Sequence, residues 1–297
     1  MQKESNDTLR GTLMELFKLS AVQQNMLIAS IMGDGEITKL YPGSRRINNS
    51  YREHYGVDYQ EYREWKQSYF PDMLYLTLKS QTLRSKSSLL FTDLYPHFYN
   101  DRGQKCIPKR LLPLCTLPHF LAVLYMDDGT LSITKTINHR KRKIYLTPSI
   151  QLALQNFPRD QLDILIEHCQ KIFGFSFRYF AVSNGHNFMI KLTTVESILS
   201  FLKLIKPVTI TCKRMYYKTN WEWRFSLEKK MIQTAYPDYE VLASSSDRTK
   251  PYSQDEMTNL IALVQKGHTS LEIAAILGRS YHSVGYKKTD LRKKGLL

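Results

Sequence analysis

The sequence predicts an α+β fold in which one helix–hairpin–helix–hairpin–helix unit occurs twice, followed by a small all-α unit. Two short apolar runs, residues 27–35 and 121–129, have the same form, since each ends in an aspartate and a glycine. Strand-like alternation and amphipathic helical spacing follow each run in the same order. From residue 251 only helical patterns remain. We therefore predict a first half over 1–110, a second half over 111–235, a linker over 236–250 and a helical module over 251–297.

In the first half, helices are predicted over residues 8–19 and 20–32, and the glycines at 33 and 35 end the second helix. A twisted hairpin over 36–55, a helix over 58–69, a strand pair over 73–84 and a helix over 87–98 follow. The helix over 58–69 is indicated by Tyr62, Trp65 and Tyr69, whose spacings of three and four place them on one face.

The second half repeats this order. Thr116 is a good N-cap for the second apolar helix, and Pro118 is tolerated in its first turn. A hairpin over 130–155, a helix over 159–173, strands over 175–193 around a turn at 183–185, and a helix over 195–204 follow. Asp34 and Asp128 lie 94 positions apart. Such a duplication implies pseudo-two-fold symmetry within one chain, so we expect a monomer.

The C-terminal module has its own helix signals. Residues 236–250 lose apolar periodicity and contain three consecutive serines, which is typical of a linker. Ser253 and Glu256 then form the pattern of a capping box that begins a helix to about residue 266. Shorter helices are predicted over 270–277 and 280–294. Their shared core is expected to contain Ile273, Ala274, Leu277, Val284 and Leu291.

The composition favours a polyanionic partner. The chain has 42 Lys and Arg against 27 Asp and Glu, a net charge of +15, which indicates nucleic acid first and an anionic membrane surface second. No apolar run approaches the roughly 18 residues of a membrane-spanning helix, and the N-terminus lacks the apolar stretch of a signal peptide. The four cysteines have no close paired spacing, so we expect reduced thiols rather than disulfides or zinc ligands.

The acids that end the two apolar runs are the clearest chemical signal. The C-terminus of a helix already carries partial negative charge, so an acid there is unfavourable. The chain makes this arrangement twice, at Asp34 and Asp128. A cation near these acids would remove the cost, and two adjacent carboxylates would hold a divalent metal.

The two runs resemble the signature of LAGLIDADG homing endonucleases, in the branch that carries two motifs in one chain. The second copy is the more specific, because residues 103–108, 114–118 and 121–129 follow one another in the order typical of that branch. Residues 205–207 through 215–218 resemble the end of the second half of such enzymes. The resemblance covers about residues 10–225 and is diffuse in the first half outside residues 27–35.

The resemblance implies a site-specific endonuclease that cuts both strands of double-stranded DNA with Mg²⁺, for which Mn²⁺ would substitute. It implies that the signature helices pack through small residues such as Ala29 and Ala122, and that Asp34 and Asp128 are the metal ligands beneath the DNA backbone. Asp127 receives no role, because the first copy has a glycine in that position.

The same alignment implies one catalytic lysine for each active site. Lys105 and Lys218 occupy the positions where the family places a basic residue, and Lys109 and Lys213 are nearby competitors. A lysine there would polarise water or stabilise the charge that develops on the phosphate.

The resemblance also implies that the hairpins after each signature helix lie in the major groove, where Arg, Asn and Gln can read bases and Lys holds phosphate. The C-terminal module resembles a helix-turn-helix unit whose third helix would face DNA, although a trihelical unit that serves only in packing is the alternative. The DNA-binding candidates are Lys39, Arg45, Arg46, Asn48, Arg52, Lys79, Gln81, Arg84, Lys86, Lys135, Arg140, Arg142, Gln151, Asn184, His186, Lys191, His282, Lys287 and Lys288.

Two other functions share this fold and stay open: an RNA maturase that helps its own intron to splice, and a DNA-binding regulator without catalysis. Nothing resembles the splicing ends of an intein, so we expect a free-standing or intron-encoded protein. Its location would be the cytoplasm or nucleoid of a bacterium or phage, or the matrix of an organelle.

Overall fold

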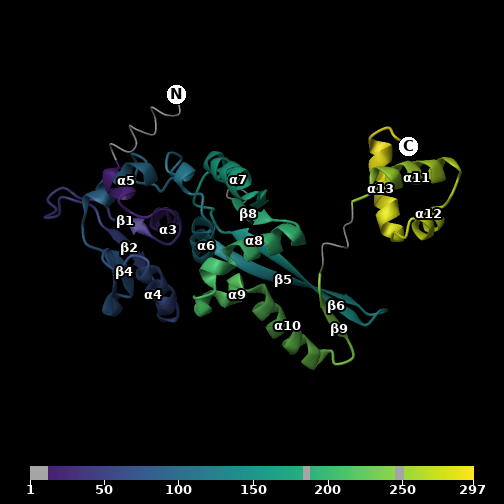
Figure 1. The fold of residues 1–297 in the computed structure, drawn as a ribbon, viewed down its shortest axis with the longest axis horizontal. Coiled ribbons are helices and arrows are strands. Elements are labelled where there is room, and N and C mark those ends of the chain that lie inside the picture. Colours follow the sequence, from purple (N-terminus) through teal and green to yellow (C-terminus); the bar gives the residue numbers. More distant parts are fainter. Residues whose placement is uncertain (1–12, 183–187, 245–250) are drawn as a thin grey trace. The chain divides into compact units, whose positions relative to one another are not determined.

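The computed structural model describes residues 13–182, 188–244 and 251–297. The chain divides after Ser245 into a large and a small compact unit (Figure 1). Across the three described ranges, no helix is both long and apolar enough to cross a lipid bilayer. All four cysteines lie in the described ranges, and none of them forms a disulfide there.

The first half of the large unit contains one four-stranded antiparallel sheet in the order β1-β2-β4-β3. Only four residues of the helix predicted over 8–19 are helical in the described part of the chain, because the helix ends at its C-cap, Lys18, and Ser20 caps the next helix. The elements are α2 (Met14–Phe17), α3 (Ala21–Met32), β1 (Glu36–Ile37), β2 (Tyr51–His54), α4 (Gln60–Ser68), β3 (Leu74–Thr77), β4 (Thr82–Ser85) and α5 (Leu89–Phe98).

The second half repeats this topology, with the sheet order β5-β6-β8-β7. The predicted repeat of helix–hairpin–helix–hairpin–helix is therefore confirmed. The elements are α6 (Pro118–Asp128), β5 (Gly129–Asn138), β6 (Lys143–Leu152), α7 (Arg159–Phe173), β7 (Arg178–Ala181), β8 (Phe188–Leu192) and α8 (Val195–Thr209). The predicted turn at 183–185 lies outside the described residues.

Helices α3 and α6 pack against each other at the centre of the large unit. Ala29 of α3 and Ala122 of α6 are fully buried, and small side chains of this kind let two helices approach closely. Ser20 caps α3 through a capping box with Gln23. Helix α6 begins one residue later than predicted, after Leu117 instead of Thr116. The backbone N–H of the N-cap residue, Leu117, donates to Asn25 Oδ1 of α3 at 2.9 Å.

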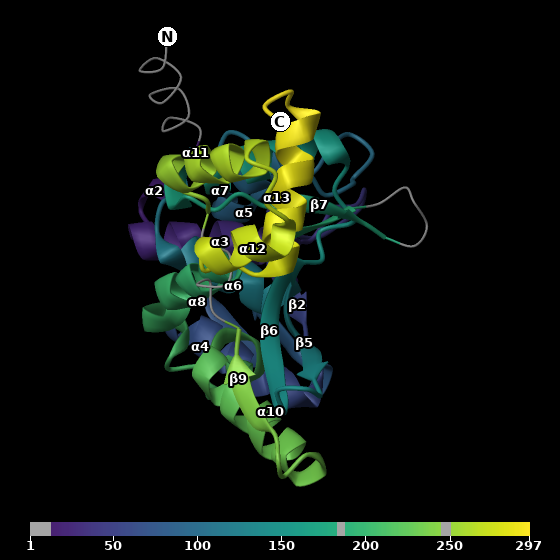
Figure 2. The same ribbon diagram turned by 90° about the vertical axis from the view of Figure 1, so that its right-hand side faces the viewer.

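Beyond α8, the chain builds an addition to the second half. Helices α9 (Tyr216–Thr219) and α10 (Trp221–Ala235) lead to strand β9 (Glu240–Ala243), which pairs in parallel with β6 (Figure 2). The predicted linker over 236–250 is therefore wrong in its first part. Val241 is buried against Ile144 and Leu146, and this burial orders a segment whose own sequence has no periodicity.

The small unit is a trihelical domain with its own core. It contains α11 (Gln254–Gln265), α12 (Ser270–Ile276) and α13 (Tyr281–Lys293), and the predicted capping box at Ser253 is present. Four of the five predicted core residues are buried together with Leu260, and Leu277 packs at the edge of this core. Three helices are thus present, while a role in DNA binding stays a prediction.

Candidate active site at the ends of α3 and α6

The two signature helices end side by side, and their acids meet there. The backbone N–H of Asp34 donates to Asp127 Oδ2 at 3.4 Å. A side chain at position 33 is excluded, because a Cβ added to Gly33 would lie 2.6 Å from Asp127 Oδ2. The glycine of the first copy therefore makes room for the aspartate that occupies the same motif position in the second copy.

Lys105 offsets the negative charge at the C-terminal end of α3. A short bridge between Tyr99 and Lys105 folds the segment after α5 back toward this helix. The Lys105 ammonium donates to the carbonyls of Gly33 at 2.9 Å and Gly35 at 2.8 Å, which lie on either side of Asp34. A cation at this position offsets the partial negative charge of the helix end and the charge of the acid.

Lys218 makes the equivalent contact at the end of α6. It donates to the carbonyls of Gly129 at 3.0 Å and Asp127 at 3.5 Å, which lie on either side of Asp128. Tyr125 on α6 fixes α9 by donating to the Lys218 carbonyl at 2.8 Å. The structure thus brings the two predicted lysines to the two predicted acids, whereas Lys109 and Lys213 are exposed and make no such contact.

Asp128 is a partly desolvated carboxylate. Burial raises its pKa, and the charges of Asp127 and Asp34 raise it further, to about 7, against the opposing effect of Lys105 and Lys218. Burial lowers the pKa of both lysines, although the nearby carboxylates partly oppose this. In the described ranges no hydrogen bond or ion pair reaches the Asp128 carboxylate, so its charge favours an external cation.

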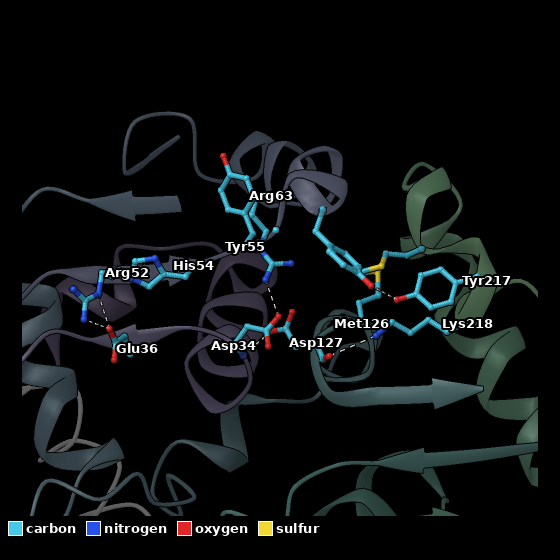
Figure 3. A pocket seen from close by; sticks show the side chains of 13 residues that line it. Asp34, Glu36, Arg52, His54, Tyr55, Arg63, Met126, Asp127, Tyr217 and Lys218 are labelled. Atoms are coloured by element: carbon cyan, nitrogen blue, oxygen red, sulfur yellow. Dashed lines mark hydrogen bonds and ion pairs between the residues drawn. The ribbon is translucent and has the colours of Figure 1, made fainter. Parts of the chain in front are cut away.

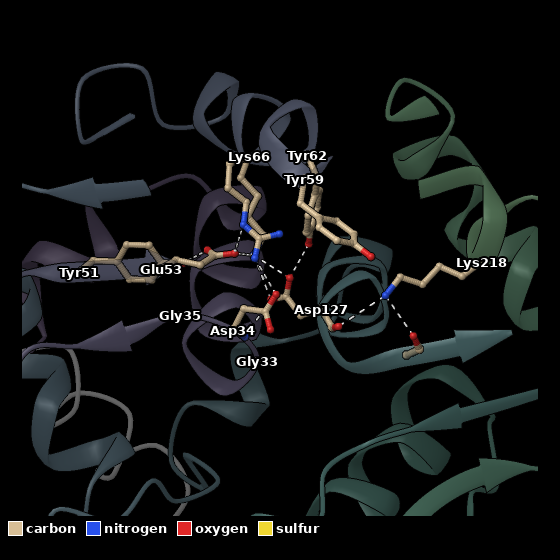
Figure 4. A network of polar contacts seen from close by, with 12 residues as sticks. Gly33, Asp34, Gly35, Tyr51, Glu53, Tyr59, Tyr62, Lys66, Asp127 and Lys218 are labelled. Atoms are coloured by element: carbon tan, nitrogen blue, oxygen red, sulfur yellow. Dashed lines mark hydrogen bonds and ion pairs between the residues drawn. The ribbon is translucent and has the colours of Figure 1, made fainter. Parts of the chain in front are cut away.

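Asp127, which the sequence left without a role, is held by a buried polar network (Figure 4). Its carboxylate accepts from Tyr62 Oη at 2.7 Å and from Lys66 Nζ at 2.8 and 2.9 Å. Burial raises the pKa of Asp127 to about 6, and the ammonium of Lys66 opposes this rise. The Lys66 side chain is only 1% exposed, so the pair is fully desolvated.

Glu53 joins this network to Asp34 through Arg63. Lys66 Nζ lies 2.9 Å from Glu53 Oε1, and Arg63 Nε lies 2.7 Å from the same oxygen. Arg63 Nη2 then reaches Asp34 Oδ2 at 2.7 Å. We call Glu53, Arg63 and Lys66 the ionic cluster. The sequence analysis missed it, although one signal was present: Lys66 lies one helical turn after Tyr62, on the apolar face of α4.

The chemistry of the acids fits a divalent cation. Oxygen atoms of Asp34, Glu53 and Asp127 all lie within 4.8 Å of one another, so this cluster could bind a divalent metal. Carboxylate oxygens are the ligands that Mg²⁺ prefers. All three acids have buried cationic partners, but the side chain of Asp34 is 38% exposed, whereas those of Asp127 and Glu53 are fully buried.

A cavity of about 340 Å³ opens beside these groups (Figure 3). Asp34, Arg63 and Asp127 line it together with Tyr217 and Lys218 from the second half. Substrate atoms in this cavity would therefore meet carboxylate, guanidinium and ammonium groups at once.

Each sheet presents an equivalent row of polar side chains on its outer face. We call these the outer rows: Glu36, Arg52, Arg84 and Tyr75 in the first sheet, and Thr130, Gln151, Lys191 and Arg178 in the second. Four DNA-binding candidates occupy matching positions in them: Arg52 corresponds to Gln151, and Arg84 to Lys191. The sequence analysis missed Tyr75, Thr130 and Arg178, which the strand register reveals.

Other candidates in the large unit lie elsewhere. Lys135 is on the opposite face of the β5–β6 hairpin, because it pairs in register with buried Leu146, and its ammonium lies 5.4 Å from the ring centre of Tyr236. Asn48 accepts a hydrogen bond from Thr92 Oγ1 at 3.1 Å, which is a structural contact. Asn184 and His186 lie outside the described residues. Gln81 is half-buried, and the exposed loop candidates are Lys39, Arg45, Arg46, Lys79, Lys86, Arg140 and Arg142.

In the small unit, two candidate lysines of α13 make contacts within the unit. Lys287 pairs with Asp290 at 3.2 Å, and Lys288 donates to Ser270 Oγ at 3.1 Å. His282 is exposed, as are Arg292 and Lys293 at the end of the helix. The exposed charge of α13 therefore lies mainly at its C-terminal end.

Comparison with known proteins identifies a family and structures with a similar fold. Residues 24–199 match the LAGLIDADG DNA endonuclease family. The homing endonuclease I-WcaI bound to its DNA recognition sequence is 22% identical, with a TM-score of 0.51, over 68% of this chain and 87% of that chain. The meganuclease I-SmaMI bound to uncleavable DNA is 11% identical, with a TM-score of 0.47, over 74% of this chain and 95% of that chain. No curated protein matches the sequence.

Proposed function

The chain belongs to the LAGLIDADG DNA endonuclease family, and we propose that it is a homing-type endonuclease that cuts both strands of a long double-stranded DNA site. One observation carries this proposal: the ends of α3 and α6 each present an aspartate whose flanking carbonyls bind a buried or half-buried lysine. Binding to DNA alone would not require paired acids and lysines at the helix ends. Because both halves are in one chain, the enzyme acts as a monomer.

Asp34 and Asp128 are the proposed ligands of Mg²⁺, and Mn²⁺ would substitute. When bound, the metal would activate a water and stabilise the leaving oxygen of the phosphodiester. Lys105 and Lys218 hold the helix ends in place and direct positive charge toward the phosphate. Their lowered pKa also eases proton transfer to or from neighbouring water.

The outer rows are the proposed base-reading surface. Arg52, Arg84 and Gln151 can form paired hydrogen bonds to purine edges, and Lys191 can hold phosphate. The net charge of +15 supplies the attraction that does not depend on base sequence.

Cleavage of a pooled library of DNA targets, with Mg²⁺ titrated, is the direct test of this function. We expect double-strand breaks at one long site, and complete loss of these breaks in Asp34→Asn and in Asp128→Asn. Calcium should support DNA binding by both variants, because the outer rows are intact. Double-strand cleavage by either variant would overturn the metal assignment. Tight binding of intron RNA without any DNA cleavage would favour a maturase instead.

The small unit is proposed to extend the DNA contact as a helix-turn-helix-like module. It has its own core, so removing residues 251–297 should leave the large unit folded. We expect this deletion to weaken DNA binding and to reduce the dependence of affinity on salt, since exposed cations of α13 are lost. Unchanged affinity and salt dependence would reject a DNA role for this unit.

A further inference from the structure

The repeated topology allows the ionic cluster to be matched with residues of the second half. In β1–β2, Glu36 pairs with Arg52, and in β5–β6, Thr130 pairs with Gln151. Glu36 and Thr130 each lie two residues after their signature aspartate. The next residues along β2 and β6, Glu53 and Leu152, are therefore equivalent.

The helices that follow extend this match. Gln60 begins α4 seven residues after Glu53, and Arg159 begins α7 seven residues after Leu152. Arg63 and Lys66 of α4 consequently correspond to Leu162 and Leu165 of α7. Leu152, Leu162 and Leu165 are all fully buried. Three buried charges in the first half thus occupy the positions of three buried leucines in the second.

Stability does not explain why the first half has charged residues at positions where the second half has leucines. A buried ion pair contributes little more than well-packed apolar side chains of similar volume, because the charges lose their hydration. The leucines show that this fold can fill the same positions with apolar groups. The charges are directed at the active-site acids instead: Lys66 binds Asp127, and Arg63 binds Asp34.

The two signature aspartates therefore differ in their surroundings. Asp34 Oδ2 accepts a charge-assisted hydrogen bond from Arg63 Nη2 at 2.7 Å, and Glu53 anchors the same guanidinium at 2.7 Å. For Asp128, the described residues provide no direct cationic partner, since Lys218 binds the carbonyls beside it.

We propose that Arg63 is a positioning residue that holds Asp34 with an internal cation and thereby makes the two active sites unequal. This inference rests on the proposed nuclease function. The Arg63 guanidinium competes with a metal ion for Asp34 Oδ2, whereas no side-chain cation of the described residues occupies an oxygen of the Asp128 carboxylate. The strand served by Asp128 is cut first, and the DNA passes through a nicked intermediate.

Calcium binding without DNA tests this competition directly. Arg63→Gln removes the competing cation, and we expect isothermal titration to show about tenfold tighter Ca²⁺ binding, which corresponds to about 1.4 kcal/mol. The matched control is Arg214→Gln, which removes a guanidinium that pairs with Asp58 outside the acid cluster. Its Ca²⁺ affinity should equal that of the wild type. Equal affinities for wild type and Arg63→Gln would overturn the proposal.

A second variant covers the case in which Arg63→Gln fails to fold. Glu53→Leu, Arg63→Leu and Lys66→Leu, combined with Asp127→Asn, copy the apolar residues of the second half and remove the acid that Lys66 neutralised. This variant should bind Ca²⁺ more tightly than the same variant with Arg63 retained, since both lack the same two acids and differ only in the cation that competes for Asp34. Equal or weaker Ca²⁺ binding than in that reference variant would contradict the role of Arg63.

Strand-resolved cleavage in Mg²⁺ provides the functional readout. We expect the wild type to nick one strand first, Asp34→Asn to nick that same strand only, and Arg63→Gln to shorten the delay before the second cut. Equal rates on both strands in the wild type would refute the inequality. If the wild type cuts no DNA, the proposed function fails, while the calcium experiment still decides whether Arg63 competes with metal.

Discussion

The two halves of the large unit share one topology but stabilise it differently. In the first half, β1 and β2 pair at only two positions, and side-chain hydrogen bonds hold the loop between them, such as Asn49 Nδ2 to the Thr38 carbonyl at 2.7 Å. In the second half, β5 and β6 pair at ten positions. Strand β9 and helix α10 cover the end of this hairpin.

The contrast extends to the interior. The first half holds the ionic cluster where the second half holds leucines. Both halves thus share the strand order and a helix that ends in an acid. They differ in the charge of their buried residues and in the length of their first hairpin. In the first half, buried charges bind the active-site acids. In the second half, the longer hairpin pairs with an additional strand, β9.

The largest expected effect comes from removing the central cation. Lys66→Met leaves the buried carboxylates of Glu53 and Asp127 without this partner, so the free energy of unfolding should fall by about 3–5 kcal/mol. The matched change in the second half, Leu165→Met, should cost less than about 1.5 kcal/mol. Urea unfolding measures both. Similar losses of unfolding free energy in the two variants would show that Lys66 contributes no more to stability than Leu165.

The support of the long hairpin gives the next effect. Val241→Ala removes buried contacts with Ile144 and Leu146, and should lower the free energy of unfolding by about 1–3 kcal/mol. Amide exchange should accelerate at 143–146 and stay unchanged at 51–54. Glu240→Ala is the control, because it breaks only the exposed pair with Lys143 and should cost about 0–1 kcal/mol. Unchanged exchange at 143–146 in Val241→Ala would show that β9 does not stabilise the hairpin.

The pH dependence of stability tests the burial of Asp128. Because the pKa of Asp128 is raised to about 7 in the folded state, the native protein retains a proton that the unfolded chain loses near pH 4. Without metal, the melting temperature should therefore fall as pH rises from about 4 to about 7. Asp128→Asn should flatten this decline in part, since Asp127, with a pKa of about 6, contributes in the same direction. A profile identical to the wild type would contradict the desolvation of Asp128.

The smallest effect concerns single contacts of the sheet faces. Lys191→Ala should weaken DNA binding and reduce the slope of log affinity against log salt by about one. Arg84→Ala, at the matching position of the first outer row, should act similarly. Lys135→Ala should change neither quantity, because Lys135 lies on the opposite face. A reduced salt slope in Lys135→Ala would show that the apolar face also meets DNA.

Local patterns in the sequence were sufficient to predict the repeat, most helix boundaries and the position of both acids. The reason is that caps such as Ser20 and Ser253, breakers such as Gly174, and strand alternation act over a few residues. The association of Lys105 and Lys218 with the two acids came from the family resemblance, and the distances in the structure are consistent with it.

Strand register, and not residue type, determines which side chains lie on the outer face of each sheet. The charge of Lys135 predicts a DNA contact, but alternation along β5 places this residue on the face that carries Leu131 and Ile133. Conversely, Thr130 and Arg178 belong to the outer row only because β5, β6, β8 and β7 pair in one register.

The sequence by itself determined the duplicated α+β topology and the two helices that end in Asp34 and Asp128, because periodicity and capping are local properties. Only the tertiary structure decided that Lys66 neutralises Asp127, that Arg63 binds Asp34 and that residues 240–243 become a strand. Each of these depends on partners distant in the chain: a buried charge is tolerated only beside its counter-ion, and an edge strand forms only where a neighbour offers free backbone groups.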